Sequence, residues 1–241
     1  MRRFCVVSAT RSGSSALMAA IAAVPGVSLP SRLAPGWAEE LLNPRFAATY
    51  ARAIGQRLGR VPRLQDSLVE AFWAASAGAS VAGFKLILGQ HHDVEAFLAE
   101  PGLAVVALLR TDLESAVASA LCAEVRQHWP REGGPQTPWR YEERMAPRVH
   151  ARVREHLYAR RLLERVDAAV RLEYERMVTP DFECPGLDTL IGGPVRIARP
   201  RPPIRAADYV ENLDALRACI AAALVAADVP AITAGQSGPD R

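Results

Sequence analysis

The apolar run Leu103–Leu109 constrains the fold of this chain more than any other feature of its sequence. A strand that is apolar at almost every position is typical of a parallel sheet, because helices cover both faces of such a sheet and bury the strand on both sides. A strand with one face in water alternates instead between apolar and polar residues. Leu103–Leu109 therefore predicts an α/β protein, in which a central, mostly parallel sheet lies between layers of helices.

Further strands and helices are expected to alternate along the chain. Apolar, β-rich runs at 4–9, 81–87 and 168–173 predict three more strands of the same sheet. Amphipathic or alanine-rich segments predict helices at 16–24, 37–42, 46–58, 64–77, 93–99, 112–127, 146–166 and 213–227. Because helices separate consecutive strands, we expect right-handed crossovers, one domain over residues 1–241 and a frayed tail from residue 233.

Composition and charge narrow the class of protein. Of the 241 residues, 50% are hydrophobic and 23% are charged, which excludes an intrinsically disordered chain and leaves a globular one. The formal net charge of +3 is too small an excess to indicate nucleic-acid binding, although it suits a small anionic ligand. Lys85 is the only lysine among 29 basic residues, which singles out that position in a chain that otherwise uses arginine.

The cysteines and the first residues of the chain bear on its compartment. Four cysteines lie at 5, 122, 184 and 219, without the Cys-x-x-Cys spacing of metal and redox sites, so we expect reduced thiols and no metal. Arg2 and Arg3 precede an apolar run as in a secretory signal, but Arg11 interrupts that run. No stretch of about 18 apolar residues could span a bilayer. We therefore expect a soluble, cytoplasmic protein with no membrane span.

A turn rich in glycine and serine, Thr10–Ser15, joins the first predicted strand to the first predicted helix. Consecutive backbone N–H groups in such a turn, the positive end of the helix dipole, and the arginine and serine side chains form a cradle for phosphate or sulfate. The turn lacks the GxxxxGK[ST] pattern of ATP-binding loops and the GxGxxG pattern of dinucleotide-binding loops, which argues against ATPases, kinases and NAD enzymes. An ordinary Ser/Gly turn with an exposed arginine is the alternative.

A second candidate site follows the predicted strand at 103–109. Arg110 ends that strand, and Thr111 and Glu114 then have the spacing of a capping box that begins a helix. Ser119 lies on that helix about two turns further on. Ligands of open α/β sheets bind at this carboxyl-terminal edge of the strands, so an arginine and a serine here suggest a ligand with two phosphate-like ends. A lone arginine at a strand end more often forms a surface ion pair.

These motifs resemble those of the sulfotransferases that use 3′-phosphoadenylyl sulfate (PAPS), and most nearly those of the bacterial trehalose sulfotransferase type. Thr10–Ser15 is similar to that type's Pro-Arg-Ser-Gly-Ser/Thr loop, with a threonine in place of the proline. Arg110–Ser119 resembles the family's 3′-phosphate segment, with Thr111 in place of a second arginine, and Gly83–Lys85 resembles its Gly-x-Lys strand. Glu40–Pro44 is similar to the family's glutamate followed by two apolar residues and Asn-Pro, and Tyr174–Glu175 to its Tyr-Glu pair at a strand end.

The resemblance implies a P-loop-like three-layer domain that transfers the sulfuryl group of PAPS to a hydroxyl of a small molecule, a sugar or a bacterial metabolite. It implies no metal, and it admits a homodimer. Glu40 is then the base that takes the acceptor's proton, with Arg11 and Lys85 as the other catalytic residues. The residues that the resemblance assigns to the donor are Arg11, Ser12, Gly13, Ser14, Ser15, Arg110, Ser119 and Arg201, the last within the basic segment Arg199–Arg205.

Alternatives stay open for both the base and the function. Glu39, next to Glu40, is the natural control for it, and a pair of solvated glutamates is the plainer interpretation of both. His91 and His92 are rival bases, although adjacent histidines at a helix start more often cap the helix or face solvent. The alternative functions are a P-loop nucleotide kinase and a non-catalytic protein that binds a nucleotide or another anion.

Overall fold

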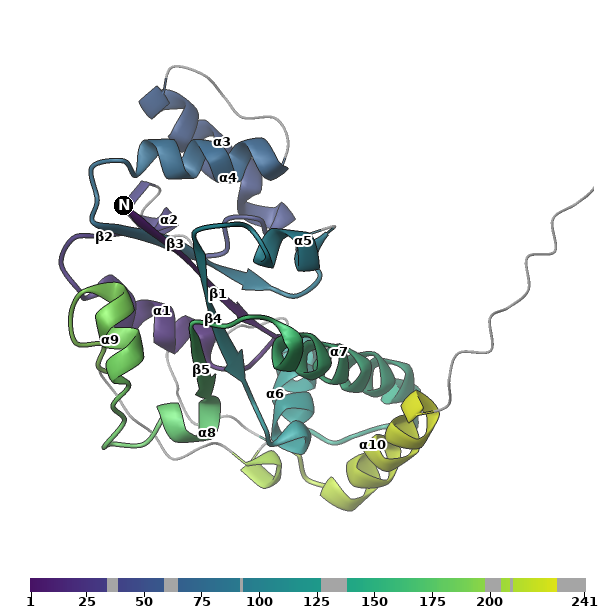
Figure 1. The fold of residues 1–241 in the computed structure, drawn as a ribbon. Coiled ribbons are helices and arrows are strands. Elements are labelled where there is room, and N and C mark those ends of the chain that lie inside the picture. Colours follow the sequence, from purple (N-terminus) through teal and green to yellow (C-terminus); the bar gives the residue numbers. More distant parts are fainter. Residues whose placement is uncertain are drawn as a thin grey trace, which may run out of the picture.

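The computed structural model describes residues 1–33, 39–58, 65–91, 93–126, 138–197, 205–208 and 210–228. Among these residues a five-stranded sheet forms from β1 (Arg2–Ser8), β2 (Val27–Ser28), β3 (Val81–Ile87), β4 (Leu103–Leu109) and β5 (Val170–Glu173) (Figure 1). All neighbouring strands are parallel, and their order across the sheet is β2-β3-β1-β4-β5. The predicted α/β class with a parallel central sheet is therefore confirmed.

Helices connect the strands. They are α1 (Ser14–Ala22), α2 (Pro30–Leu33), α3 (Pro44–Leu58), α4 (Gln65–Ala75), α5 (Val94–Leu98), α6 (Leu113–Arg126), α7 (Ala146–Arg165), α8 (Tyr174–Met177), α9 (Pro185–Ile191) and α10 (Leu213–Asp228), with short 3₁₀ helices η1 (Glu143–Met145) and η2 (Ala206–Asp208). No helix within the described residues is long and apolar enough to cross a membrane.

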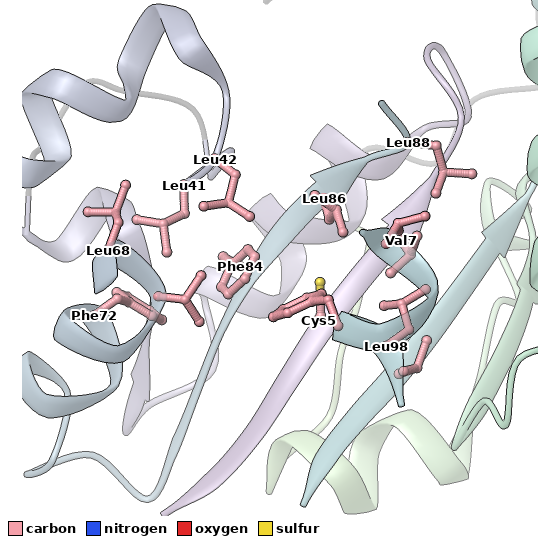
Figure 2. Packing of buried hydrophobic residues seen from close by; sticks show 14 of the residues in the cluster. Cys5, Val7, Leu41, Leu42, Leu68, Phe72, Phe84, Leu86, Leu88 and Leu98 are labelled. Carbon is pink, nitrogen blue, oxygen red and sulfur yellow. The ribbon is translucent and has the colours of Figure 1, made fainter. Parts of the chain in front are cut away.

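Two clusters of buried side chains cover the two faces of the sheet. Successive strand residues point to opposite faces, so Cys5 of β1 lies in one cluster and Phe4 in the other. The first cluster packs the sheet against α3, α4, α5 and α7, and the rings of Phe72 and Phe84 meet edge to face there, with centroids 5.9 Å apart (Figure 2). The second packs the opposite face against α1, α8 and α9, so the sheet lies between helical layers.

A third cluster joins α6, α7 and α10 on the side of the sheet where β4 lies. Val117 of α6, Val153 of α7 and Leu216 of α10 are fully buried in it. Trp139 is also buried there, and its backbone forms an isolated parallel bridge with Val210. This cluster brings the last described helix against the two helices that follow β4 in the chain.

The predicted elements agree best with the structure where a strand or helix is long. β3 and β4 have the predicted bounds, and the ends of α3, α4, α6, α7 and α10 differ from the predicted ones by at most two residues. The predicted helix at 37–42 is wrong where it is described, because Glu39–Leu42 form a bend and a turn. The carbonyl of Glu39 accepts a hydrogen bond from the Lys85 N–H at 2.8 Å, which ties this segment to β3 and prevents coiling. The tail from residue 233 lies outside the described residues.

Candidate functional site

The order of the strands places the candidate site between β1 and β4. From β1 the chain continues toward β2, on one side of the sheet, whereas from β4 it continues toward β5 on the other side. Adjacent strands whose connections diverge in this way leave a crevice outside their carboxyl ends, where open α/β sheets bind ligands. The turn Ala9–Gly13 follows β1 at this point, and Arg110–Asp112 follows β4.

The turn after β1 has the backbone shape of an anion cradle. Arg11 and Gly13 both adopt left-handed conformations, with φ of 64° and 81°. A Cβ atom on Gly13 would lie 2.3 Å from Cδ2 of the Tyr174 ring, so both the conformation and the space require glycine. No side chain among the described residues caps α1, and the buried Ser12 hydroxyl has no hydrogen-bond partner there. Such donors suit an anionic ligand.

Residues from the segment after β4 contact this turn directly. Arg11 Nε donates a hydrogen bond to Ser119 Oγ on α6 at 3.0 Å, and Arg110 Nη1 donates to the Arg11 carbonyl at 3.1 Å. The Arg110 guanidinium also lies 4.6 Å from the centroid of the Tyr174 ring. The two candidate sites of the sequence therefore form one cluster, in which Arg11, Arg110 and Ser119 are neighbours.

Tyr174 and Glu175, at the start of α8, lie against both segments. The Glu175 carboxylate accepts hydrogen bonds from the backbone N–H groups of Thr111, at 3.2 Å, and Asp112, at 3.0 Å. It also lies 4.0 Å from Arg110 Nε. The sequence alone assigned no role to this Tyr-Glu pair. In the structure, Glu175 holds the segment after β4, and the Tyr174 ring packs against the turn after β1.

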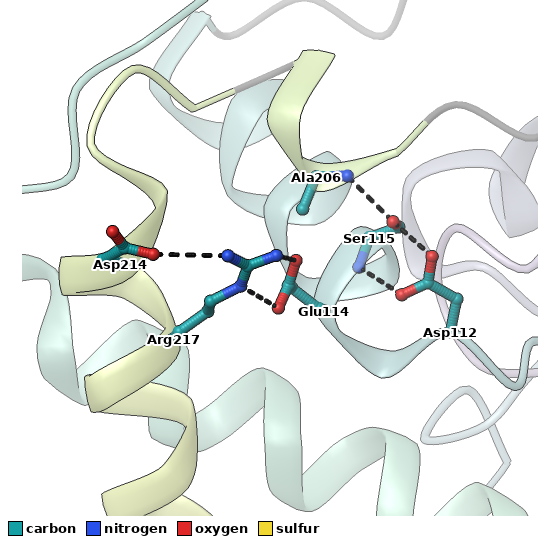
Figure 3. Close-up of polar contacts among 6 residues, drawn as sticks. All are labelled: Asp112, Glu114, Ser115, Ala206, Asp214 and Arg217. Carbon is teal, nitrogen blue, oxygen red and sulfur yellow. Dashed lines mark hydrogen bonds and ion pairs between the residues drawn. The ribbon is translucent and has the colours of Figure 1, made fainter.

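The predicted capping box at the start of α6 is wrong (Figure 3). Asp112 is the cap, because its Oδ1 accepts a hydrogen bond from the Ser115 N–H at 2.9 Å. Glu114 turns away and receives two hydrogen bonds from the guanidinium of Arg217 on α10, at 2.7 and 3.1 Å. Ser115 Oγ accepts from the Ala206 N–H at 2.9 Å, so the chain beyond the basic segment returns beside the start of α6.

Lys85, Glu40 and Ser15 meet on the other side of the turn. Lys85 Nζ lies 2.9 Å from Glu40 Oε1 and donates a hydrogen bond to Ser15 Oγ at 3.1 Å. Asn43 Nδ2 and Gln90 Nε2 donate to the second carboxylate oxygen of Glu40, at 2.6 and 2.8 Å. Lys85 is buried, with 4% of its side chain exposed, and Glu40 keeps 17%. Three motifs that are far apart in the sequence thus converge on one ion pair.

The two neighbouring glutamates have opposite surroundings. Burial alone would raise the pKa of Glu40, but the Lys85 charge and three hydrogen bonds outweigh it and hold that pKa below its ordinary value. The Glu39 carboxylate accepts a hydrogen bond from the Ser31 N–H at 2.9 Å, and burial raises its pKa above the ordinary value. Glu40 is therefore the carboxylate that is ionised beside the turn.

The rival base His91 makes local contacts. Its Nδ1 accepts a hydrogen bond from the Asp93 N–H at 3.1 Å, and its ring stacks on Phe97 with centroids 5.1 Å apart. Asp93 in turn caps α5. His92 lies outside the described residues, as do Arg199 and Arg201 of the basic segment; Arg205 is described and exposed.

Two residues of α7 that sequence reasoning missed lie behind the turn. The Glu155 carboxylate accepts hydrogen bonds from both the backbone N–H and the hydroxyl of Thr10. His156 is buried, and this burial is the main reason that its pKa falls to about 4. The ring is therefore neutral at pH 7. A Glu-His pair inside a helix full of charges gives no local signal. The packing of α7 against the sheet, which brings it beside Thr10, is what reveals the pair.

Outside this cluster, the described residues offer weaker candidates for a functional site. A cavity of about 430 Å³ between α7 and α10 is lined by Ala146, Pro147, His150, Arg154, Ala223, Ala226 and Ala227, none of them a residue of the site. Within the described ranges, the His, Cys, Asp and Glu side chains form no group of three or more that could hold a metal ion. The cluster around Thr10–Ser15 is thus the strongest candidate for chemistry.

Comparison with known proteins adds no further information, because the sequence matches no protein-family model and no curated protein.

Proposed function

We propose that this chain is a sulfotransferase that moves the sulfuryl group of PAPS to a hydroxyl of a small molecule. The observation that carries the proposal is the position of Lys85, whose ammonium group lies between the Glu40 carboxylate and Ser15, in the first turn of α1 directly after the anion turn Ala9–Gly13. A cradle for an anion, a buried cation and an ionised carboxylate are the groups that this transfer needs, and they lie together at the edge of the sheet.

The donor would lie across the crevice between β1 and β4. The turn Ala9–Gly13 and the N-terminus of α1 suit its 5′-phosphosulfate. Among the described residues, the Ser12 hydroxyl has no hydrogen-bond partner and no side chain caps α1. Arg110 and Ser119 suit its 3′-phosphate, and Arg11 touches Ser119 and so lies between the two ends. We also propose that the sheet is of the P-loop-like type, because β1 is central and an anion turn separates it from α1.

PAPS supplies an activated sulfuryl group, bonded through oxygen to its 5′-phosphate. In the transfer, a bond forms between the acceptor oxygen and sulfur while the bond from sulfur to the phosphate oxygen breaks. Glu40 takes the proton of the acceptor hydroxyl. Arg11, Lys85 and the amides of the turn stabilise the negative charge that develops on the leaving 3′,5′-ADP, as preorganised cations and dipoles do at other transferring groups. As Lys85 turns toward that charge, Glu40 loses its ion pair and becomes a stronger base.

The donor is tested first by thermal unfolding with 3′,5′-ADP, against ADP and against ATP with magnesium. At a hundredfold excess over the dissociation constant, ligand binding stabilises the folded state by about 2.7 kcal/mol, or roughly 5 to 10 °C for a chain of this size. We expect that shift with 3′,5′-ADP, independent of magnesium and lost in Arg110→Ala. A shift with ATP and magnesium alone would favour the nucleotide kinase.

Transfer itself is tested by incubating the protein with PAPS and a panel of sugars and small alcohols and detecting sulfated products by mass spectrometry. We expect at least one acceptor to be sulfated by the wild type and none by Arg11→Ala. Tight binding of 3′,5′-ADP without any transfer over a broad panel would favour the non-catalytic anion-binding protein instead.

A further inference from the structure

The conformation of Arg11 raises the question of what holds the anion turn in place. A residue other than glycine seldom adopts a left-handed φ such as 64° unless its surroundings impose it. The contacts at Arg11 and its neighbour Thr10 include the hydrogen bond of the Arg11 side chain to Ser119, that of the Arg11 carbonyl with Arg110, and two from Thr10 to Glu155. A bound anion would compete for the groups in some of these contacts and not in others.

Two of these contacts involve groups that a bound anion would compete for. Arg11, Arg110 and Ser119 are the donors expected to turn toward phosphate or sulfate, so their mutual hydrogen bonds are exchanged when a ligand binds. Thr10 and Glu155 are different. Both hydrogen bonds between them involve Thr10 atoms that the carboxylate already satisfies, at 3.0 Å for the backbone N–H. A bound anion would therefore not need to displace this contact.

Glu155 is itself firmly held on α7. Arg152, one turn earlier, pairs with Glu155 and also donates from its Nε to Glu124 of α6 at 2.7 Å. Val153 and Ala159, on either side of Glu155, are buried in two different clusters. Burial would raise the pKa of Glu155, but the hydrogen bonds of Thr10 and the pairing with Arg152 hold it below the ordinary value. The Glu155 carboxylate is thus ionised and is held by both Thr10 and Arg152.

We propose that Glu155 is a positioning residue that holds the anion turn, through Thr10, in the conformation that binds the ligand. It does not touch the ligand. The identity of that ligand rests on the proposed function, but the role of Glu155 does not, since it concerns the shape of the turn for any phosphate or sulfate group.

The test compares two carboxylates that share Arg152. Glu155→Gln weakens both contacts of Glu155 with Thr10 as well as its ion pair with Arg152. Glu124→Gln weakens only the ion pair between Glu124 and Arg152. In Glu155→Gln we expect amide hydrogen exchange at residues 9–16 to become about tenfold faster, and the dissociation constant of 3′,5′-ADP to rise about tenfold. Glu124→Gln changes both by less than twofold. Equal effects of the two variants, or none in Glu155→Gln, overturn the proposal.

Substitutions at Thr10 separate positioning from general loss of structure. Thr10→Ser keeps both hydrogen bonds to Glu155 and is expected to weaken binding less than Thr10→Val, which removes the hydroxyl and reproduces part of the Glu155→Gln effect. The double variant Thr10→Val/Glu155→Gln is expected to lose less affinity than the sum of the two single losses. Strict additivity would contradict the contact.

Failure of the proposed function is recognised separately. If the wild type does not bind 3′,5′-ADP, hydrogen exchange and the affinity for inorganic phosphate still compare Glu155→Gln with Glu124→Gln. The proposal for Glu155 then stands if the turn exchanges faster and phosphate binds more weakly only in Glu155→Gln, and it is overturned if the two variants agree.

Discussion

At the scale of the residue, Glu39 and Glu40 show that neighbouring carboxyl groups can have opposite effects on the pH dependence of stability. Glu40 has a pKa below its ordinary value of about 4.3, so its ionised form stabilises the fold above that pH, and the contribution is lost as the pH falls through the folded pKa. Glu39 has a raised pKa, so its ionisation opposes folding, and stability falls as the pH rises past about 4.3.

We therefore expect the two glutamine variants to give slopes of opposite sign. The free energy of unfolding of the wild type, minus that of Glu40→Gln, should increase with pH between about 3 and 6. The same difference for Glu39→Gln should decrease over that range. Urea unfolding at several pH values measures both. Two slopes of the same sign would mean that Lys85 does not distinguish the two carboxyls.

His156 gives a third residue-scale prediction. Its pKa falls from an unfolded value of about 6.5 to about 4, mainly because burial disfavours the charged ring. Above about pH 6.5 the ring is neutral in both the folded and the unfolded chain. As the pH drops from there toward 4, the unfolded chain takes up the proton first, so the free energy of unfolding declines. We expect His156→Gln to lose this part of the decline. An unchanged unfolding profile over that pH range would show that the ring takes up its proton without opening the fold.

At the scale of the element, β3 shows how one glycine allows a strand to lie beside another. A Cβ atom on Gly83 would lie 2.4 Å from the ring of Phe4, which is fully buried between β1 and α1. The register pairs Phe4 with Gly83, and Lys85 follows two residues later on the same face. Gly83 therefore leaves room for the Phe4 ring beside β3, on the face of the sheet from which Lys85 reaches Ser15.

We expect Gly83→Ala to destabilise the fold by about 1–3 kcal/mol through overpacking. Gly78→Ala is the control, because a Cβ atom there would meet nothing within 4 Å. The double variant Phe4→Leu/Gly83→Ala should recover part of the loss. Chemical unfolding of the three variants measures these differences, and a Gly83→Ala as stable as Gly78→Ala would contradict the packing argument.

The elements that could be predicted from sequence are those whose own residues determine them. β4 was predicted with its observed bounds because a continuous apolar run is typical of a buried strand. The end of that strand then fixed the positions of Arg110, directly after β4, and of Ser119, on the next helix. The two residues of β2 and the short helix α8 have too few residues to show a period. Glu39–Leu42 were predicted as helix because nothing local shows that β3 binds their backbone. The roles proposed for these residues stay predictions.

At the scale of the whole molecule, the parallel sheet brings together two groups of side chains that serve different parts of the proposed reaction. Arg110 and Ser119 come from the β4 side of β1, and Lys85 and Glu40 come from the β3 side. The anion turn after β1 touches the first group through Arg11, and α1, which follows the turn, touches the second through Ser15. A central β1 is what makes such a division possible.

This arrangement predicts that donor affinity and the chemical step can be impaired independently. Ser119→Ala removes the acceptor of the Arg11 hydrogen bond and a donor to the ligand, so the dissociation constant of 3′,5′-ADP should rise about 5- to 10-fold, as expected for a hydrogen bond of about 1 kcal/mol. Glu40→Gln should leave that constant within twofold, because Glu40 lies on the other side of the turn. It should lower kcat by about 10²- to 10⁴-fold, since a general base is lost.

Calorimetry with 3′,5′-ADP and the rate of sulfate transfer to an acceptor found by the panel measure the two quantities. Glu39→Gln is the matched control for Glu40→Gln, because the neighbouring Glu39 carboxylate accepts its hydrogen bond from the Ser31 N–H. If Glu40→Gln weakened nucleotide binding as much as it slowed transfer, the carboxylate would be acting through the conformation of Lys85 and the turn. In that case the two sides of β1 would form one binding site, and the base would have to be sought elsewhere.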